Sequence, residues 1–174
     1  MNVNKLSINI GKILIENGLK FIQQGFKIEP KEVGWSEMTN FISNKLGCES
    51  GFMDGKFYVI KIDDWKNFIE FDWTKEKKYV AEKFDCDNFA HTFASHISEL
   101  FDITVGTCYG KVYNKDTGKY IDLHYWNVII TKEIDNQLHL YFYEPMNGLF
   151  SEVLNRSKIV VGNMKYEPIK LTLF

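Results

Sequence analysis

A stripe of apolar residues between Phe89 and Leu100 restricts this chain to folds in which one helix packs a whole face into a core. Apolar side chains recur at intervals of three to four residues, at Phe89, Phe93, Ile97 and Leu100. This spacing is typical of an amphipathic helix. Asp85 stands just before the stripe, where its carboxylate can cap the helix by accepting a backbone N–H. The sequence therefore predicts a helix that begins at Cys86.

The predicted helix carries Cys86 in its first turn and on its inward face. Helix N-termini stabilise anions, so this position favours the thiolate, which is the reactive form of cysteine. The carboxylates of Asp85 and Asp87 act in the opposite direction, because negative charges raise the pKa of a nearby thiol. A cysteine on an inward helical face can also be only a small buried apolar side chain, and this second interpretation stays open.

Composition limits the classes of protein to which the chain can belong. The 174 residues are 45% hydrophobic and 25% charged, with a net charge of −2, so we expect one globular domain over residues 1–174 and no binding of nucleic acid. Three scattered cysteines predict neither a disulfide framework nor a zinc site. No signal peptide or membrane span is evident, so we expect a cytoplasmic protein that does not bind membranes. The oligomeric state is not predicted.

The first part of the chain, residues 1–75, is expected to be mostly helical and to cover the core. Apolar periodicity predicts helices over residues 5–17, ending at Gly18, and over residues 36–46, ending at Gly47. The pair Asp54-Gly55 predicts a hairpin turn, followed by a strand over residues 57–62. Asp63 or Asp64 can then cap a short helix.

After the cysteine helix the pattern changes from helix to sheet. Residues 103–113, 120–131 and 138–144 have the β-branched and aromatic composition of strands and are joined by short polar segments, which predicts an antiparallel meander. Residues 159–162 and 169–174 can add further strands. The expected fold class is α+β, with N-terminal helices and the cysteine-bearing helix packed on an antiparallel sheet.

Two polar residues fall on the inward faces of neighbouring predicted strands. His124 shares a face with Trp126 and Val128, and Glu144 ends an apolar stripe in the next strand. A buried carboxylate needs a partner, and His124 is the available one. In an antiparallel pair, His124 and Glu144 lie on the same face of the sheet only if the numbers of each two directly opposed residues add up to an even number, because a slip of one residue moves every side chain to the other face. A loop of three or five residues around Asp135-Asn136 gives such a register.

A cysteine at a helix N-terminus, a histidine and a carboxylate are the components of an activated thiol nucleophile. In this hypothesis His124 takes the proton of Cys86, and Glu144 orients the imidazole and stabilises its charge. His91 and His96 lie on the cysteine's own helix, and His139 alternates away from the carboxylate. A single histidine in a strand is more often a core or surface residue without catalytic function, but three polar groups on converging faces favour the triad.

These residues also resemble a known superfamily. The segments that carry the resemblance are 84–90 (FDCDNFA), 124–127 (HYWN) and 143–145 (YEP). Over residues 79–147 the chain resembles the papain-like cysteine peptidases, in a bacterial and phage branch that is similar to the C-terminal calcium-dependent peptidase domain of mushroom agglutinins. The resemblance implies a papain-like or transglutaminase-like fold, with residues 79–147 as the catalytic motif region.

The resemblance also implies roles for individual residues. Cys86 corresponds to the nucleophile, His124 to the base and Glu144 to the third member of the triad. It further implies a calcium ion near the acidic motif, with Asp85, Asp87 and Asn88 as candidate ligands, and hard oxygen ligands suit calcium. No glutamine precedes Cys86 at the position where papain-like enzymes use one, so backbone amides or Tyr79 would stabilise an oxyanion.

Two functions of different classes follow. The first is a cysteine-nucleophile hydrolase, peptidase-like or amidase-like, that acts on a peptide or protein substrate with a Cys86-His124-Glu144 triad and no organic cofactor. The alternative is a non-catalytic phage or bacterial binding protein, which keeps the scaffold and acts on a host protein by interaction. An aromatic content of 16% supplies enough large side chains for a binding surface.

Overall fold

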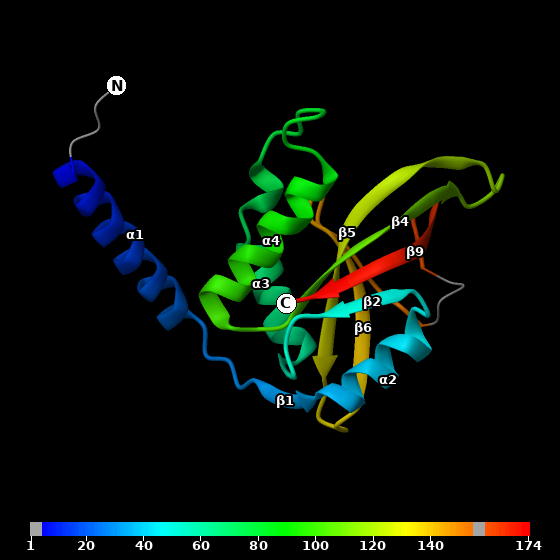
Figure 1. The fold of residues 1–174 in the computed structure, drawn as a ribbon, viewed down its shortest axis with the longest axis horizontal. Coiled ribbons are helices and arrows are strands. Elements are labelled where there is room, and N and C mark those ends of the chain that lie inside the picture. Colours follow the sequence, from blue (N-terminus) through cyan, green and yellow to red (C-terminus); the bar gives the residue numbers. More distant parts are fainter. Residues whose placement is uncertain (1–4, 155–158) are drawn as a thin grey trace.

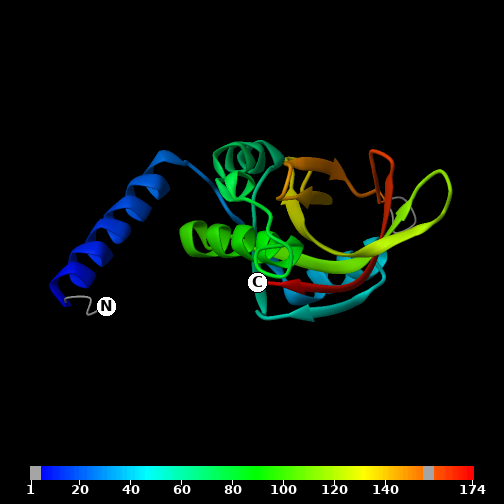
Figure 2. The ribbon, with the colours of Figure 1, turned by 90° about the horizontal axis from the view of Figure 1, so that it is seen from above.

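A curved, mixed sheet forms the centre of the molecule and carries helices on both faces (Figures 1 and 2). The computed structural model describes residues 5–154 and 159–174. The strand order in the large sheet is β2-β9-β4-β5-β6-β7, and β8 pairs with β9 outside this path. The strands are β2 (Glu49–Phe52), β4 (Val105–Asn114), β5 (Tyr120–Lys132), β6 (Leu138–Glu144), β7 (Leu149–Glu152), β8 (Val160–Val161) and β9 (Met164–Leu173).

The sheet separates two hydrophobic clusters. On one face α2 (Trp35–Lys45) and the small two-stranded sheet of β1 (Lys31–Gly34) and β3 (Lys56–Val59) pack against even-numbered residues of β5 and β6, such as Ile130 and Leu140. On the other face α3 (Ile62–Phe71) and α4 (Cys86–Phe101) pack against residues such as Ile129 and Tyr143. A short 3-10 turn, Thr74–Glu76, follows α3. The fold is therefore α+β, with a layer of elements on each face of one sheet.

Helix α4 forms as its apolar stripe predicts. It begins at Cys86 with Asp85 as the N-cap residue, and the inward residues of the stripe are buried. The buried amide of Asn127 on β5 donates to the carbonyl oxygens of Ala90 on α4, at 2.9 Å, and Gly106 on β4, at 3.2 Å. These two bonds fix the first turns of the helix against the sheet, because a buried amide that lost them would remain desolvated without compensation.

The meander of β4, β5 and β6 has the predicted antiparallel pairing. Strand β5 pairs with β6 in a register that opposes Ile130 with Leu140, so that the residue numbers sum to the even value of 270. The strands end at Lys132 and begin again at Leu138, which leaves a five-residue loop. The even register predicted for the pair that carries His124 and Glu144 is thus confirmed.

The N-terminal part differs from the prediction in two ways. Helix α1 (Lys5–Gly25) continues through Gly18 and extends away from the body (Figure 1), because one interior glycine costs only about 1 kcal/mol. Ile13 and Leu14 on this helix are exposed, so the prediction that the helix covers the core is wrong. Leu6 belongs to the same predicted apolar side, but its side chain lies outside the described residues. Helix α2 does cover the sheet, and Gly47 follows its C-cap with a φ of 57°.

The hairpin predicted at Asp54-Gly55 does not form. The strands on either side of this turn belong to different sheets: β2 pairs with β9 in parallel, and β3 pairs with β1. Three further strands, β1, β2 and β7, were not predicted. In the part of the chain that the structure describes, no helix has the length and apolarity needed to cross a membrane.

Candidate functional site

His124 and Glu144 form the tightest polar contact at the end of the β5–β6 pair. Nε2 of His124 lies 2.5 Å from Oε2 of Glu144. The carboxylate is buried, with 3% of the residue exposed, and its other oxygen accepts the backbone N–H of Met146 at 3.2 Å. Both carboxylate oxygens therefore have donors, as a buried charged group requires. The imidazole is held in one orientation by this contact.

The thiol of Cys86 lies at the same imidazole. It hydrogen-bonds with His124, so the structure brings together all three residues of the predicted triad. Burial lowers the pKa of His124, but the hydrogen bonds with Cys86 and Glu144 raise it and outweigh burial, and the resulting pKa is about 9 instead of 6.5. A thiol beside an imidazole that a carboxylate orients is an arrangement that can activate sulfur as a nucleophile.

The other three histidines lie away from this contact. His96 accompanies Asp72, with Nδ1 3.1 Å from Oδ1, in a separate buried cluster. His139 contacts Glu152 on the surface. His91 is on the solvent-facing side of α4, with its ring 5.8 Å from that of Tyr125. Among the histidines, the chemistry of Cys86 therefore depends on His124.

A cleft of about 340 Å³ opens above the His124–Glu144 pair. Its polar side chains come from the start of α4, from β5, from the end of β6 and from the turn after β6, and its apolar side chains come from β4, β5, β9 and the segments next to α4 and β6. The lining residues are Tyr79, Cys86, Val112, Ile121, Asp122, Leu123, His124, Glu144, Met146, Asn147, Met164 and Tyr166. This volume and this mixture of apolar walls with a few polar groups are typical of small-ligand sites.

The sequence did not predict most of the cleft walls. Met164 and Tyr166 reach the site from β9, more than 75 residues after Cys86 in the chain. Burial raises the pKa of Tyr166 to about 12, so its hydroxyl stays protonated and can donate a hydrogen bond. Tyr79 stands at the rim and is half exposed. The sequence names Tyr79 as a candidate to stabilise an oxyanion, but the local patterns around Met164 and Tyr166 contain no signal for a site, because only the tertiary fold brings β9 to the cleft.

The three candidate calcium ligands lie together at the start of α4, where they also cap the helix. Oδ1 of Asn88 accepts the backbone N–H of Asp85, and Oδ1 of Asp87 accepts that of Asn88. A hydrogen bond between the two carboxyl groups raises the pKa of Asp85 and lowers that of Asp87. Residues 5–154 and 159–174 contain no group of three or more His, Cys, Asp or Glu residues that could hold a metal ion. The pair alone does not make a calcium site, since calcium takes six to eight oxygen ligands, and calcium stays a prediction.

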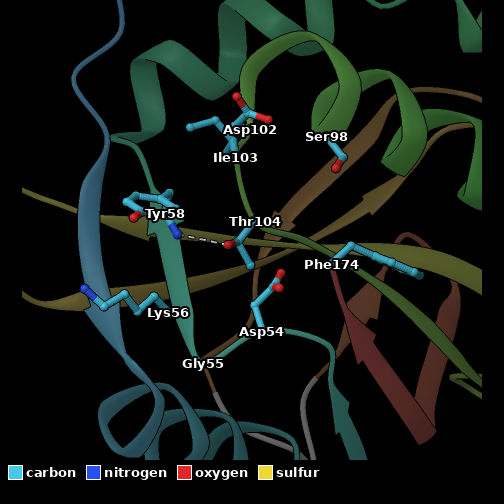
Figure 3. Close-up of a pocket in the computed structure, with 9 residues that line it drawn as sticks. All are labelled: Asp54, Gly55, Lys56, Tyr58, Ser98, Asp102, Ile103, Thr104 and Phe174. Atoms are coloured by element: carbon cyan, nitrogen blue, oxygen red, sulfur yellow. Dashed lines mark hydrogen bonds between the residues drawn. The ribbon is translucent and has the colours of Figure 1, made fainter.

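A second cavity, of about 460 Å³, lies on another part of the surface, between β3, the end of α4 and Phe174 (Figure 3). Its polar groups do not converge. Lys56 is directed away from Asp54 in Figure 3 and binds Glu32, and Oγ1 of Thr104 already accepts the backbone N–H of Tyr58 at 3.0 Å. We therefore place the functional site at the cleft beside His124, where the polar groups face one another.

A comparison of the sequence with curated proteins gives no match. The structure described as the PSL1a–E64 complex matches with a TM-score of 0.58 and 19% identity, over 81% of this chain and 51% of that protein. A structure of Polyporus squamosus lectin bound to the human-type influenza-binding epitope Neu5Aca2-6Galb1-4GlcNAc matches with a TM-score of 0.49 and 20% identity, over 72% of this chain and 42% of that protein. At these identities the likeness concerns the fold, and this chain spans about half of each protein.

A family model provides the assignment. The model of the ricin-type beta-trefoil lectin C-terminal domain matches residues 38–161, which is more than half of the chain. This match overturns the prediction of a cysteine hydrolase with a peptide or protein substrate, because lectins are defined by the binding of carbohydrate. The alternative prediction, a binding protein, agrees better with the match. Physically, a thiol, an imidazole and a carboxylate supply hydrogen-bonding groups as well as a nucleophile, so their presence alone does not establish catalysis. The resemblance to mushroom agglutinins is correct at the level of the lectin domain, and the papain-like fold stays a prediction. The chain belongs to the family of ricin-type β-trefoil lectin C-terminal domains.

Proposed function

We propose that this protein is a carbohydrate-binding domain whose ligand occupies the cleft beside His124. The observation that supports the proposal most directly is the convergence, in a cleft of about 340 Å³, of an exposed aromatic ring with free polar groups. The family assignment supports the same class of ligand. A sugar has both apolar C–H faces and many hydroxyl groups, so it needs a site with both kinds of surface.

The apolar part of the proposed site consists of Tyr79, Ile121 and Leu123. These residues are between 41% and 50% exposed, so they offer surface that a ligand can cover. An aromatic ring with an accessible face provides a flat apolar platform and a hydroxyl at its edge. Burial of this surface by the C–H face of a sugar supplies the non-directional part of the binding energy.

The polar part consists of Asp122, Asn147 and Tyr166. Oδ1 of Asp122 accepts the backbone N–H of Leu123, which leaves its second oxygen for a ligand hydroxyl. Oδ1 of Asn147 accepts the N–H of Leu149, so the amide group of Asn147 keeps its donors. Asp122 thus offers an acceptor, and Asn147 and Tyr166 offer donors, at fixed positions. A sugar hydroxyl that does not match these groups gives up its hydrogen bonds to water without replacing them, so the site can distinguish the orientations of sugar hydroxyls.

His124 has a different role in this proposal. Its imidazole already contacts Glu144 and Cys86, so it forms the rigid floor of the cleft. Rings of Trp126 and Tyr166 flank it, with centroids 6.4 Å and 6.2 Å away. A floor that is fixed before binding lowers the entropy lost when a ligand is ordered.

The proposal is tested by screening the protein on a glycan array and measuring the best ligand by calorimetry. We expect Tyr79→Ala and Asp122→Asn to weaken binding by roughly five- to tenfold each, the effect of about 1 kcal/mol per lost interaction. Tyr58→Ala is the matched control, because Tyr58 is also exposed but lines the cavity near Asp54. Absence of any glycan ligand, or equal binding by all variants, would refute the proposal.

A further inference from the structure

The charged side chains that line the cleft beside His124 do not balance one another. The pKa of about 9 keeps the His124 imidazole protonated at neutral pH, so it compensates the carboxylate of Glu144, which it contacts. Asp122 lines the same cleft. In the part of the chain that the structure describes, it forms no ion pair, and its carboxylate accepts only the backbone N–H of Leu123. The cleft therefore carries one uncompensated negative charge.

The lysines that adjoin the cleft residues of β4 and β9 face the other side of the sheet. Val112 and Tyr166 line the cleft and are opposed across the two strands. Lys111 and Lys165 are each one residue away from them, and side chains alternate between the faces of a sheet along a strand. Among the described residues, no Lys or Arg lines the cleft. A sugar carboxylate or sulfate would therefore meet Asp122 without a cation to bind it.

The aromatic ring at the rim of the cleft belongs to the same negative region. Partial desolvation raises the pKa of Tyr79. The negative charges of Asp85, Glu82 and Asp122 add to this increase, so carboxylates surround the hydroxyl end of the ring. Tyr79 is 50% exposed, so a ligand can reach the ring. Since carboxylates and aromatic faces both attract cations, this rim favours a positively charged group.

We propose that the cleft selects glycans that carry an amino sugar with a free ammonium group, which binds the carboxylate of Asp122, and that it rejects sulfated and carboxylated sugars. The inference rests on the proposed function, since it concerns the same site. An ammonium group supplies hydrogen-bond donors together with the charge that the cleft lacks. Its charge-assisted hydrogen bonds with a carboxylate are stronger than those of a neutral hydroxyl or acetamido group.

The experiment compares three methyl glycosides that share one sugar ring and differ in charge: glucosamine, N-acetylglucosamine and N-acetylglucosamine 6-sulfate. The ¹⁵N-labelled protein is titrated with each at pH 6, where the amino group is protonated. The corresponding galactose-configured series is titrated in parallel, so that the orientation of one hydroxyl does not decide the result. In at least one configuration, we expect the amino sugar to bind at least about fivefold more tightly than its acetamido form. We expect the sulfated sugar to bind at least about fivefold more weakly than the acetamido form.

The variant Asp122→Asn removes the charge and keeps the shape of the side chain. We expect the affinities for the amino and acetamido sugars to come within about twofold of each other in this variant. Asp54→Asn is the matched control, because Asp54 is also exposed but lines the second cavity. It should keep the preference of the wild type. An unchanged preference in Asp122→Asn, or an equal loss in both variants, overturns the proposal.

The possible results separate this proposal from the proposed function. If neutral sugars shift the resonances of cleft residues and bind as tightly as the amino sugars, or if a sulfated sugar binds best, carbohydrate binding stands and the charge preference is overturned. The same holds if a glycan from the array binds the cleft and no amino sugar does. If no sugar from the array or from this series shifts the cleft residues, both are overturned.

Discussion

Nε2 of His124 lies 2.5 Å from Oε2 of Glu144, although 20 residues separate them in the chain. The even register of β5 and β6 puts both residues on one face of the sheet. On one side this pair adjoins the hydrophobic core, since Trp126 and Phe142 lie next to it on the same face of the sheet. On the other side His124 and Glu144 line the cleft. Protonation of the pair should therefore affect both stability and binding.

The first prediction concerns the pH dependence of stability. The folded state raises the pKa of His124 from 6.5 to about 9, so it binds the proton more tightly than the unfolded state does. The resulting stabilisation is fully present below about pH 6.5, is lost as the pH rises through about 9, and is on the order of 3 kcal/mol. We expect His124→Gln to lower the free energy of unfolding more at pH 6 than at pH 10, as measured by urea denaturation.

The matched control for this measurement is His139→Gln. His139 also contacts a carboxylate, that of Glu152, but both side chains are partly exposed. Exposed ion pairs contribute little to the free energy of unfolding. We expect its effect to be small at both values of pH. A loss of stability in His124→Gln that is the same at pH 6 and pH 10 would show that the imidazolium does not stabilise the fold.

The second prediction concerns the reactivity of Cys86. A neighbouring imidazole can take the proton of a thiol, so alkylation of Cys86 by iodoacetamide near neutral pH should slow by at least about tenfold in His124→Gln. Cys48 is a control within the same sample, because it is also half-buried but does not line the cleft beside His124. Its rate should not change. Equal rates for Cys86 in both proteins would mean that the contact with His124 does not activate the thiol.

The sequence predicted the elements whose signals are local. The apolar stripe and the capping position of Asp85 were enough to predict α4, and alternation predicted β4, β5 and β6. From these elements the position of Cys86 near His124 and Glu144 could be inferred, because it required only one helix, two strands and a register.

Other parts of the fold depend on contacts between distant segments. The parallel pairing of Glu49 with Lys170 joins two segments that are far apart in the chain, and no local pattern around either residue indicates it. The same reason explains why the hairpin at Asp54-Gly55 was predicted wrongly: the turn residues are present, but each flanking strand finds a better partner elsewhere. The cleft walls from β9 could not be predicted for this reason either.

The third prediction concerns Gly110, which faces His124 across the β4–β5 pair. A Cβ atom at this position would lie 2.3 Å from the carbonyl oxygen of Glu167 and 2.6 Å from the ring of Trp126. A backbone carbonyl in a sheet cannot move easily, so Gly110→Ala should destabilise the protein by about 1–3 kcal/mol. The control is Gly55→Ala, since a Cβ atom there would have nothing within 4 Å. Equal melting temperatures for the two variants would contradict this account of β4 packing.

The fourth prediction concerns calcium at Asp85 and Asp87. A cation that binds only the folded protein raises its melting temperature by mass action, and it would offset the repulsion between the two neighbouring carboxylates. We expect calcium to raise the melting temperature of the wild type at pH 7, and we expect this increase to disappear with a chelator or in Asp87→Ala. Identical melting in all of these samples would leave helix capping as the only role of the two residues.

The central claim, that the cleft beside His124 binds carbohydrate, is tested most directly by titrating the ¹⁵N-labelled protein with the best glycan from the array and mapping chemical-shift changes. We predict that the largest changes occur at Tyr79, Asp122 and Asn147, and that residues around the second cavity, such as Asp54 and Thr104, do not change. Changes confined to the second cavity, or no changes at a glycan concentration of several millimolar, would contradict the claim.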